Sequence, residues 1–223
     1  MPAMKRFLVI GLGHFGSWVA RALHAQGHEV IAVEEQGELV DRHASMVSRG
    51  VVGDATDREL LREIGAGTVD AAVISTGEDL ATSILATLAL RDMGVTDIFV
   101  KVTSPEAARA LEAFQVRETI FPEREVAYRL AHRIASQTVL DYLPLSEGYS
   151  IQEIAIPDRW LGKTLRELAL PQRYGIQVVA VYDVLTDTMQ VVPDAEKPLK
   201  ESDVAIVAGR DERVAEVLGE SPG

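Results

Sequence analysis

Three glycines near the start of the chain, Gly11, Gly13 and Gly16, have the G-x-G-x-x-G spacing of a phosphate-binding loop. An apolar run precedes them and a helical pattern follows, so the loop is predicted to join a strand to a helix. Gly11 would permit the tight turn, Gly13 would let backbone amides approach a pyrophosphate, and Gly16 would let the helix pack closely on the strand. The positive end of that helix would then face the phosphates. The alternative is a tight turn that binds nothing.

Two acidic residues, Glu34 and Glu35, end the second strand expected in this unit, which spans residues 7–35. They follow the glycines by roughly 20 residues, the separation at which a carboxylate accepts hydrogen bonds from a ribose hydroxyl. Because strand, glycine turn, helix and distal acid are all in register, the sequence favours a nucleotide or dinucleotide site over an empty turn.

Catalytic groups for a nicotinamide-dependent dehydrogenase are missing from the expected places. Such an enzyme needs a proton relay, usually His with an acid or Tyr with Lys. All five histidines precede residue 140, and no Tyr has Lys four residues later. The segment 162–164 reads Gly-Lys-Thr like the end of a phosphate loop, but Pro157 stands where that loop requires its first glycine. A regulatory protein is therefore predicted, and an NAD-dependent oxidoreductase is the less favoured alternative.

The composition limits the partners. The formal charge of −12, from 34 acids against 22 Lys and Arg, repels nucleic acid phosphates and anionic membrane surfaces alike. No nucleic acid polymer is therefore expected as a partner, and any work at a membrane would require docking on another protein. The absence of cysteine excludes disulfides and thiolate metal sites and is compatible with a reducing cytosol. No apolar run approaches the length of about 18 residues that spans a membrane.

The elements expected up to residue 122 alternate between strand and helix. Short apolar strands are predicted at 50–52, 71–75, 97–102 and 119–121, after the two strands of residues 7–35. Six strands that alternate with helices and short loops are typical of an α/β fold, a Rossmann-like doubly wound parallel sheet.

The alternation of short strands and helices ends at Pro122. A helix over 123–139 carries apolar residues at Val126, Leu130, Ile134 and Val139, a stripe suited either to a partner helix or second copy, or to the chain's own sheet. Residues 140–149 contain Pro144 and Gly148, which predict a hinge. The predicted domains are thus 1–139, which is nucleotide-binding and ends in this helix, a dimerising one if the stripe meets a second copy, the hinge 140–149, and a small α+β regulatory domain over 150–218.

Several short motifs extend this pattern over nearly the whole chain. They lie at 11–16, 28–34, 53–56, 100–102 and 121–125 in the first domain, and at 161–165, 174–176, 202–203 and 209 in the second. Together they resemble the regulatory subunits of Trk/Ktr-type potassium uptake systems. In that family an RCK nucleotide-binding domain (RCK-N) precedes a small C-terminal domain (RCK-C).

The resemblance implies a cytoplasmic protein whose nucleotide domains dimerise and assemble, commonly as an octameric ring, on the inner face of a separate membrane-embedded potassium-translocating subunit. ATP, ADP or NAD(H) would then change the shape of the ring and the ion flux. The resemblance also assigns nucleotide-binding residues, which are Gly11, Leu12, Gly13, His14, Phe15, Gly16, Glu34, Glu35, Asp54, Ala55, Thr56, Thr76, Gly77 and Lys101.

The resemblance also implies a divalent cation and a second ligand, cyclic di-AMP, in some members of the family. Glu123 corresponds to an acid that in some members holds a divalent cation at the dimer interface. Some members bind cyclic di-AMP in the C-terminal domain with a basic residue three before a Tyr-Gly pair, and that position is Pro171 here. Cyclic di-AMP is therefore left open as a partner. His14 stands where these subunits often have an arginine that reaches the phosphate of a neighbouring nucleotide, which puts triphosphate sensing in question and suggests a pH-sensitive response.

Overall fold

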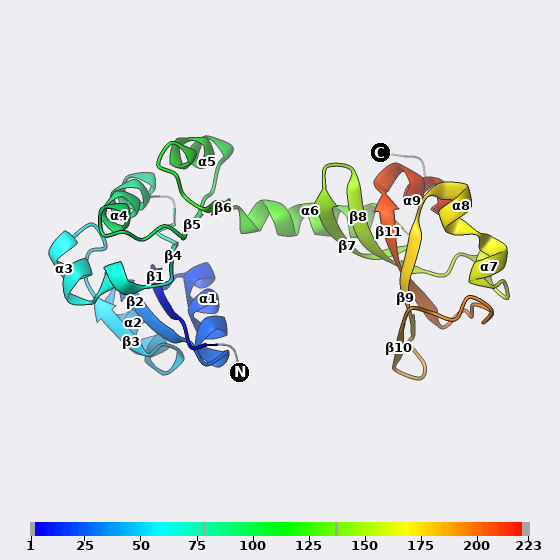
Figure 1. Ribbon diagram of the computed structural model, residues 1–223, viewed down its shortest axis with the longest axis horizontal. Helices are drawn as coiled ribbons and strands as arrows, with labels where there is room; N and C mark the ends of the chain where they lie inside the picture. The colour runs from blue at the N-terminus through cyan, green and yellow to red at the C-terminus, as the bar shows by residue number, and fades with distance from the viewer. Residues whose placement is uncertain (1–2, 78, 137, 220–223) are drawn as a thin grey trace. The chain divides into compact units, whose positions relative to one another are not determined.

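The chain folds into two compact units, Met1–Glu123 and Arg124–Gly223, which are described separately below. The computed structural model describes residues 3–77, 79–136 and 138–219 (Figure 1). In these ranges no helix is both long enough and apolar enough to cross a membrane.

The first unit is built on a six-stranded parallel sheet with the order β3-β2-β1-β4-β5-β6. All six predicted strands are present, and the predicted Rossmann-like fold is confirmed. The strand order reverses between β1 and β4, which is where open α/β sheets bind ligands. The strands are β1 (Arg6–Ile10), β2 (Glu29–Glu34), β3 (Arg49–Val52), β4 (Ala71–Ile74), β5 (Ile98–Lys101) and β6 (Glu118–Ile120).

Helices cover both faces of this sheet, because alternate strand residues point to opposite sides. Val9 and Val30 belong to one apolar core, with helices α1 (His14–Ala25) and α2 (Gly37–His43). Leu8 and Ile31, their neighbours along the same strands, belong to the other. That second core includes residues of α3 (Arg58–Glu63), α4 (Leu80–Asp92) and α5 (Pro105–Glu112). The 3-10 turns Ala44–Met46 and Ala66–Thr68 complete the unit.

The second unit contains a five-stranded antiparallel sheet with the order β10-β9-β11-β8-β7. Its core gathers around Trp160, Ile154 and Ile176. The predicted small α+β domain is therefore present. Its elements are α6 (Pro122–Ala135), β7 (Val139–Ser146), β8 (Tyr149–Ala155), the 3-10 turn Asp158–Trp160, α7 (Leu165–Leu168), α8 (Leu170–Tyr174), β9 (Gln177–Asp183), β10 (Thr188–Val191), β11 (Asp203–Arg210) and α9 (Asp211–Leu218).

The prediction of a hinge at 140–149 is wrong. These residues form most of β7 and the turn into β8, so they belong to the sheet of the second unit. Pro144 favours a break in the chain, but β7 is an edge strand, where a proline is tolerated. The helix also ends at Ala135, and Val139, predicted to lie on its apolar stripe, is instead buried at the start of β7. The two compact units accordingly divide between residues 123 and 124, and not near 139.

Two side-chain contacts hold α6 against β7. Arg129 Nη2 donates to both carboxylate oxygens of Asp141, at 3.0 and 2.8 Å. The ring of His132 stacks on that of Tyr142 with 3.9 Å between centroids. The helix is therefore an integral part of the second unit.

Candidate nucleotide-binding site

The glycine loop after β1 has the geometry that the sequence predicts. Gly11 has φ +87°, and a Cβ there would lie 2.2 Å from the carbonyl oxygen of Ser75. A Cβ on Gly16 would lie 2.0 Å from the carbonyl oxygen of Gly11. Both obstacles are backbone atoms, so no side-chain movement could make room. These two glycines are required to bring β1, β4 and α1 together.

Gly13 has a different role, since a Cβ there would meet no atom within 4 Å. It is the N-cap residue of α1, has no side chain to cap the helix, and the first turn of α1 contains no acid. The amide groups at this end of the helix are thus left available for an anion. Gly13 keeps the approach to them free of side-chain atoms.

The carboxylate of Glu34 fixes this loop from the end of β2. Its Oε2 accepts a hydrogen bond of 2.7 Å from the amide of Leu12, and its Oε1 accepts one of 3.1 Å from the amide of Gln36. Each carboxylate oxygen has more than one lone pair, so the group can still accept from a hydroxyl. Glu34 therefore sets the loop conformation and remains suited to a ribose.

These residues surround a cavity of about 290 Å³ at the carboxyl ends of β1, β2, β3 and β4. The cavity lies over the strand reversal, between the glycine loop and the loops after β2, β3 and β4. We refer to it as the nucleotide cavity. The residues around it are Ile10, Gly11, Gly13, Val33, Glu34, Glu35, Gln36, Leu39, Gly53, Ala55, Ser75, Thr76, Gly77, Asp79 and Thr82.

Seven of the fourteen predicted residues line this cavity, namely Gly11, Gly13, Glu34, Glu35, Ala55, Thr76 and Gly77. Leu12 and His14 line a neighbouring cavity instead. Phe15, in the first turn of α1, is partly buried and packs against the apolar core, and Gly16 is buried. Asp54 Oδ1 accepts from the amide and hydroxyl of Thr56, at 2.7 and 2.8 Å, so this pair shapes the loop after β3 and only Ala55 between them reaches the cavity.

Sequence reasoning missed the polar wall formed by Ser75, Asp79 and Thr82. Asp79 is the N-cap of α4 and accepts from the amide of Thr82 at 2.9 Å, and that backbone hydrogen bond lowers the pKa of the Asp79 carboxyl. The sequence does contain a signal for this cap, because Asp79 is an acid that directly precedes a helical pattern, as a typical N-cap residue does. The sequence alone did not place this cap beside the glycine loop.

Lys101 does not line the nucleotide cavity. Its Nζ lies 2.6 Å from Oε1 of Glu123, and its side chain is only 14% exposed while that of Glu123 is 60% exposed. The hydrogen bond from Lys101 lowers the pKa of the Glu123 carboxyl. The predicted metal-binding carboxylate is thus already neutralised by a lysine, and in the described residues no group of three or more His, Cys, Asp or Glu could hold a metal ion.

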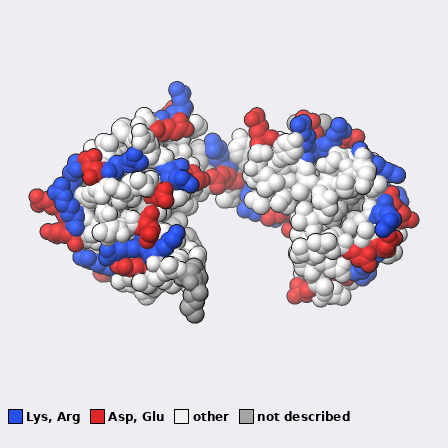
Figure 2. Space-filling model, in the orientation of Figure 1, with Lys and Arg blue, Asp and Glu red and all other residues white. Residues whose placement is uncertain are grey.

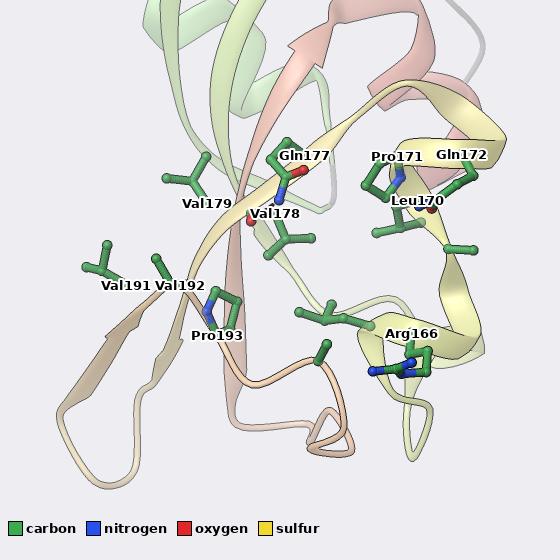
Figure 3. Close-up of a pocket in the computed structure, with 13 residues that line it drawn as sticks. Arg166, Leu170, Pro171, Gln172, Gln177, Val178, Val179, Val191, Val192 and Pro193 are labelled. Carbon is green, nitrogen blue, oxygen red and sulfur yellow. Dashed lines mark hydrogen bonds between the residues drawn. The ribbon is translucent and has the colours of Figure 1, made fainter.

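The second unit has a larger cavity, of about 640 Å³, between α7, α8 and the strands β9 and β10. Figure 3 shows Leu170 and Pro171 of α8 on one side of it and Val178 and Pro193 on the other. Arg166 is the one charged residue among the described residues that line it, and its guanidinium is paired with Glu196. Pro171, at the position where a basic residue would serve cyclic di-AMP, therefore contributes to a mainly apolar wall.

The surfaces of the two units also differ. In the view of Figure 2, Lys, Arg, Asp and Glu are interspersed over the first unit, whereas the second shows a broad area of other residues. Exposed apolar side chains of the second unit include Leu185, Met189, Val191 and Val192.

Comparisons with known proteins agree with this architecture. The family model of the TrkA-N domain matches residues 7–122, and that of the TrkA-C domain matches 151–219. The Ktr system potassium uptake protein C of Bacillus subtilis (strain 168) is 38% identical over 205 residues, which cover 92% of each chain. The Ktr system potassium uptake protein A of Vibrio alginolyticus is 34% identical over 214 residues, or 96% of each chain.

A solved structure of the GsuK channel bound to NAD has the same fold, with a TM-score of 0.69 and 17% identity over 99% of this chain and 40% of that one. Both domains, their order and nearly the full length of the chain are thus accounted for by one group of proteins. The chain belongs to the family of Trk/Ktr potassium uptake proteins, which the TrkA-N and TrkA-C domains define.

Proposed function

We propose that this protein is a non-catalytic, nucleotide-sensing regulatory subunit of a potassium uptake system. Its partner is a separate membrane-embedded subunit that carries the ion, so the protein itself works in the cytoplasm at the inner face of the membrane. The observation that carries the proposal is the nucleotide cavity. A glycine loop with free helix amides and a Glu34 carboxylate meet there at the strand reversal.

The ligand is a nucleotide of the ATP, ADP or NAD(H) group. Glu34 and Glu35 both line the nucleotide cavity, and acids at this position suit a free ribose hydroxyl but repel a 2′-phosphate. NAD(H) is therefore favoured over NADP(H). Phosphates would lie over Gly13, and the base would lie toward Ala55.

Regulation requires that the nucleotide bind one conformation of the assembly better than another. A difference of about 1–3 kcal/mol is enough for a coupling of roughly 5- to 150-fold. The loops that line the nucleotide cavity follow four different strands, so a bound ligand contacts several elements at once. That arrangement supports a ligand-dependent change in shape.

Assembly as a dimer that builds a ring of eight is part of the proposal. Val126, Leu130 and Ile134 form one exposed apolar stripe on α6, where no residue is buried. A second copy of the same helix is a suitable occupant. A divalent cation at Glu123 would have to displace Lys101 or recruit carboxylates from another copy.

The cavity of the second unit gives no support for cyclic di-AMP. The two phosphates of that ligand would meet one guanidinium, that of Arg166, which is already paired with Glu196. A stand-alone nucleotide sensor with another partner is the alternative function. An NAD-dependent oxidoreductase is the third candidate, and turnover of NADH with a panel of substrates would support it.

Calorimetric titration of the full chain with ATP, ADP, NADH and AMP tests the proposal. We expect saturable binding of at least one of them, and binding of none would contradict a nucleotide sensor. Potassium flux through the membrane subunit in proteoliposomes, with and without this protein, separates the first two functions. A flux that is indifferent to both protein and nucleotide would favour a different partner.

A further inference from the structure

A second cavity of the first unit, of about 390 Å³, lies between α1 and α2. Its apolar residues are Leu12, Leu39 and Met46. It adjoins the nucleotide cavity, with which it shares only Gly13 and Leu39. We refer to it as the α1/α2 cavity.

The charge of the α1/α2 cavity is opposite to that of its neighbour. Within the described part of the chain, the ionisable residues that line it are His14, Arg21, Arg42 and His43, and none is an Asp or Glu. Of the residues that the structure describes, Glu34, Glu35 and Asp79 line the nucleotide cavity, and no Lys or Arg does. In a chain with 34 acids and 22 Lys and Arg, a concave surface with only basic ionisable groups is unusual.

Two of these basic groups, Arg42 and His43, have side-chain atoms without a partner in the ranges that the structure describes. Among the described residues Arg42 has no hydrogen bond or ion pair, whereas Arg6 and Arg58 of the same unit are paired with Glu29 and Asp92. The Nδ1 atom of His43 is buried without a hydrogen-bond partner in the same part of the chain. An unpaired guanidinium at the rim of an apolar cavity is suited to a phosphate or carboxylate.

The cavity also offers a flat aromatic surface. Trp18 is 64% exposed, and the guanidinium of Arg21 lies over its ring, 5.1 Å from the ring centroid. A planar ring can stack on an exposed indole, and a neighbouring arginine can pair with an anion attached to that ring. Trp18, Arg21 and Arg42 together select a ligand with both features.

We propose that the α1/α2 cavity binds a second nucleoside phosphate, separate from the one in the nucleotide cavity. Its base stacks on Trp18, and its phosphates face Arg42 and His43. Because Gly13 borders both cavities, occupancy of one would alter the loop that shapes the other. The inference adds a second ligand to the proposed function but does not depend on the first ligand being bound.

Tryptophan fluorescence provides the test, since the chain has only Trp18 and Trp160. Trp160 is 3% exposed in the core of the second unit. In the full chain with Trp160→Phe, ADP should quench the remaining emission, and calorimetry should give two ADP per chain. If that variant does not fold, the wild type serves, because buried Trp160 contributes a constant background.

The double variant Arg21→Ser/Arg42→Ser should weaken the second binding event at least tenfold and abolish the quenching, with the first event unchanged. Arg62→Ser, which removes an exposed arginine from α3, is the matched control and should change neither. One ADP per chain whose affinity falls in the double variant would overturn the proposal, because a single nucleotide would then reach into both cavities. Unchanged quenching in the double variant would also overturn it. Quenching without the first event would instead contradict the nucleotide cavity alone.

Discussion

The nucleotide cavity of the first unit and the cavity between α7, α8 and β10 in the second are built in opposite ways. The first lies where parallel strands end together, so backbone amides and short polar side chains converge on it. The second lies against the edge of an antiparallel sheet, where apolar side chains make the wall. The shape of the first cavity is therefore set mainly by backbone geometry, and that of the second by side chains.

Glycine substitutions give the strongest test of that contrast. Gly16→Ala places a methyl group 2.0 Å from a backbone oxygen, whereas Gly209→Ala in β11 places one 2.7 Å from a side-chain carbon of Ile176. We expect Gly16→Ala to destabilise the first unit by about 4 kcal/mol or more. Gly209→Ala should destabilise the second unit by about 1–3 kcal/mol.

Urea unfolding measures both effects, because Trp18 reports on the first unit and Trp160 on the second. Gly13→Ala is the control for Gly16→Ala. It has room for its methyl group and should leave stability within about 1 kcal/mol of the wild type while weakening nucleotide binding. Equal stability losses for Gly16→Ala and Gly209→Ala would remove the proposed difference between the units.

Glu34→Ala tests whether one carboxylate both shapes and completes the nucleotide cavity. The substitution leaves the amides of Leu12 and Gln36 without their acceptor and removes the group proposed for the ribose. A lost hydrogen bond to a charged group is worth about 1.5–3 kcal/mol, so nucleotide affinity should fall roughly 10- to 150-fold. Calorimetry with ADP measures the change.

Glu35→Ala is the matched control, since Glu35 lines the same cavity without a hydrogen bond to the described chain. It should lower affinity by less than threefold, an energy below about 0.7 kcal/mol. If the two variants behaved alike, the effect would be one of net charge and not of loop geometry.

The sequence predicted the fold well because its signals are local. Apolar runs, the glycine spacing and the acids at helix starts each specify an element within a few residues, and the six strands of the first unit lie close to their expected positions, whereas β7 was not expected. That strand was missed because whether Pro144 breaks a strand depends on whether the strand lies at an edge, which sequence does not show.

The site was predicted less completely because it depends on distant segments meeting. The glycines, Glu34 and Ala55 follow from position after a strand, but Asp79 and Thr82 reach the nucleotide cavity only through the pairing of β1 with β4. Lys101 is the reverse case, a residue that was predicted for the site but does not lie in it. Its place on β5 was predicted, yet its side chain pairs with Glu123 and does not line the nucleotide cavity.

The stability of the second unit at acidic pH should depend on one of its carboxylates. Burial opposes ionisation of Asp183, but hydrogen bonds from Lys200, Ser202 and the amide of Leu185 outweigh it and lower its pKa to about 2. This value is below the unfolded pKa of about 3.9. Asp183 therefore stabilises the fold fully above about pH 4, and the contribution is lost as the pH falls toward 2.

Asp183→Asn should accordingly be less stable than the wild type at pH 7, with a difference that shrinks between pH 4 and 2. Chemical unfolding followed through Trp160 across this pH range measures it. Asp158→Asn, which removes an exposed carboxylate with no side-chain hydrogen bond in the described chain, should follow the wild-type curve. A difference between Asp183→Asn and the wild type that stayed constant down to pH 2 would contradict the assignment.

The smallest expected effect is a gain in stability from a substitution at the rim of the cavity in the second unit. Val192 has φ +62° and is 86% exposed, so a β-branched residue holds a left-handed conformation without burying its side chain. Asparagine tolerates that conformation, and Val192→Asn should stabilise the isolated chain by about 1 kcal/mol. Val191→Asn, at an exposed neighbour with φ outside this region, should give no gain. A loss of stability in Val192→Asn, greatest at high protein concentration, would mean that another copy covers this valine and that side-chain packing in the assembly outweighs the strain.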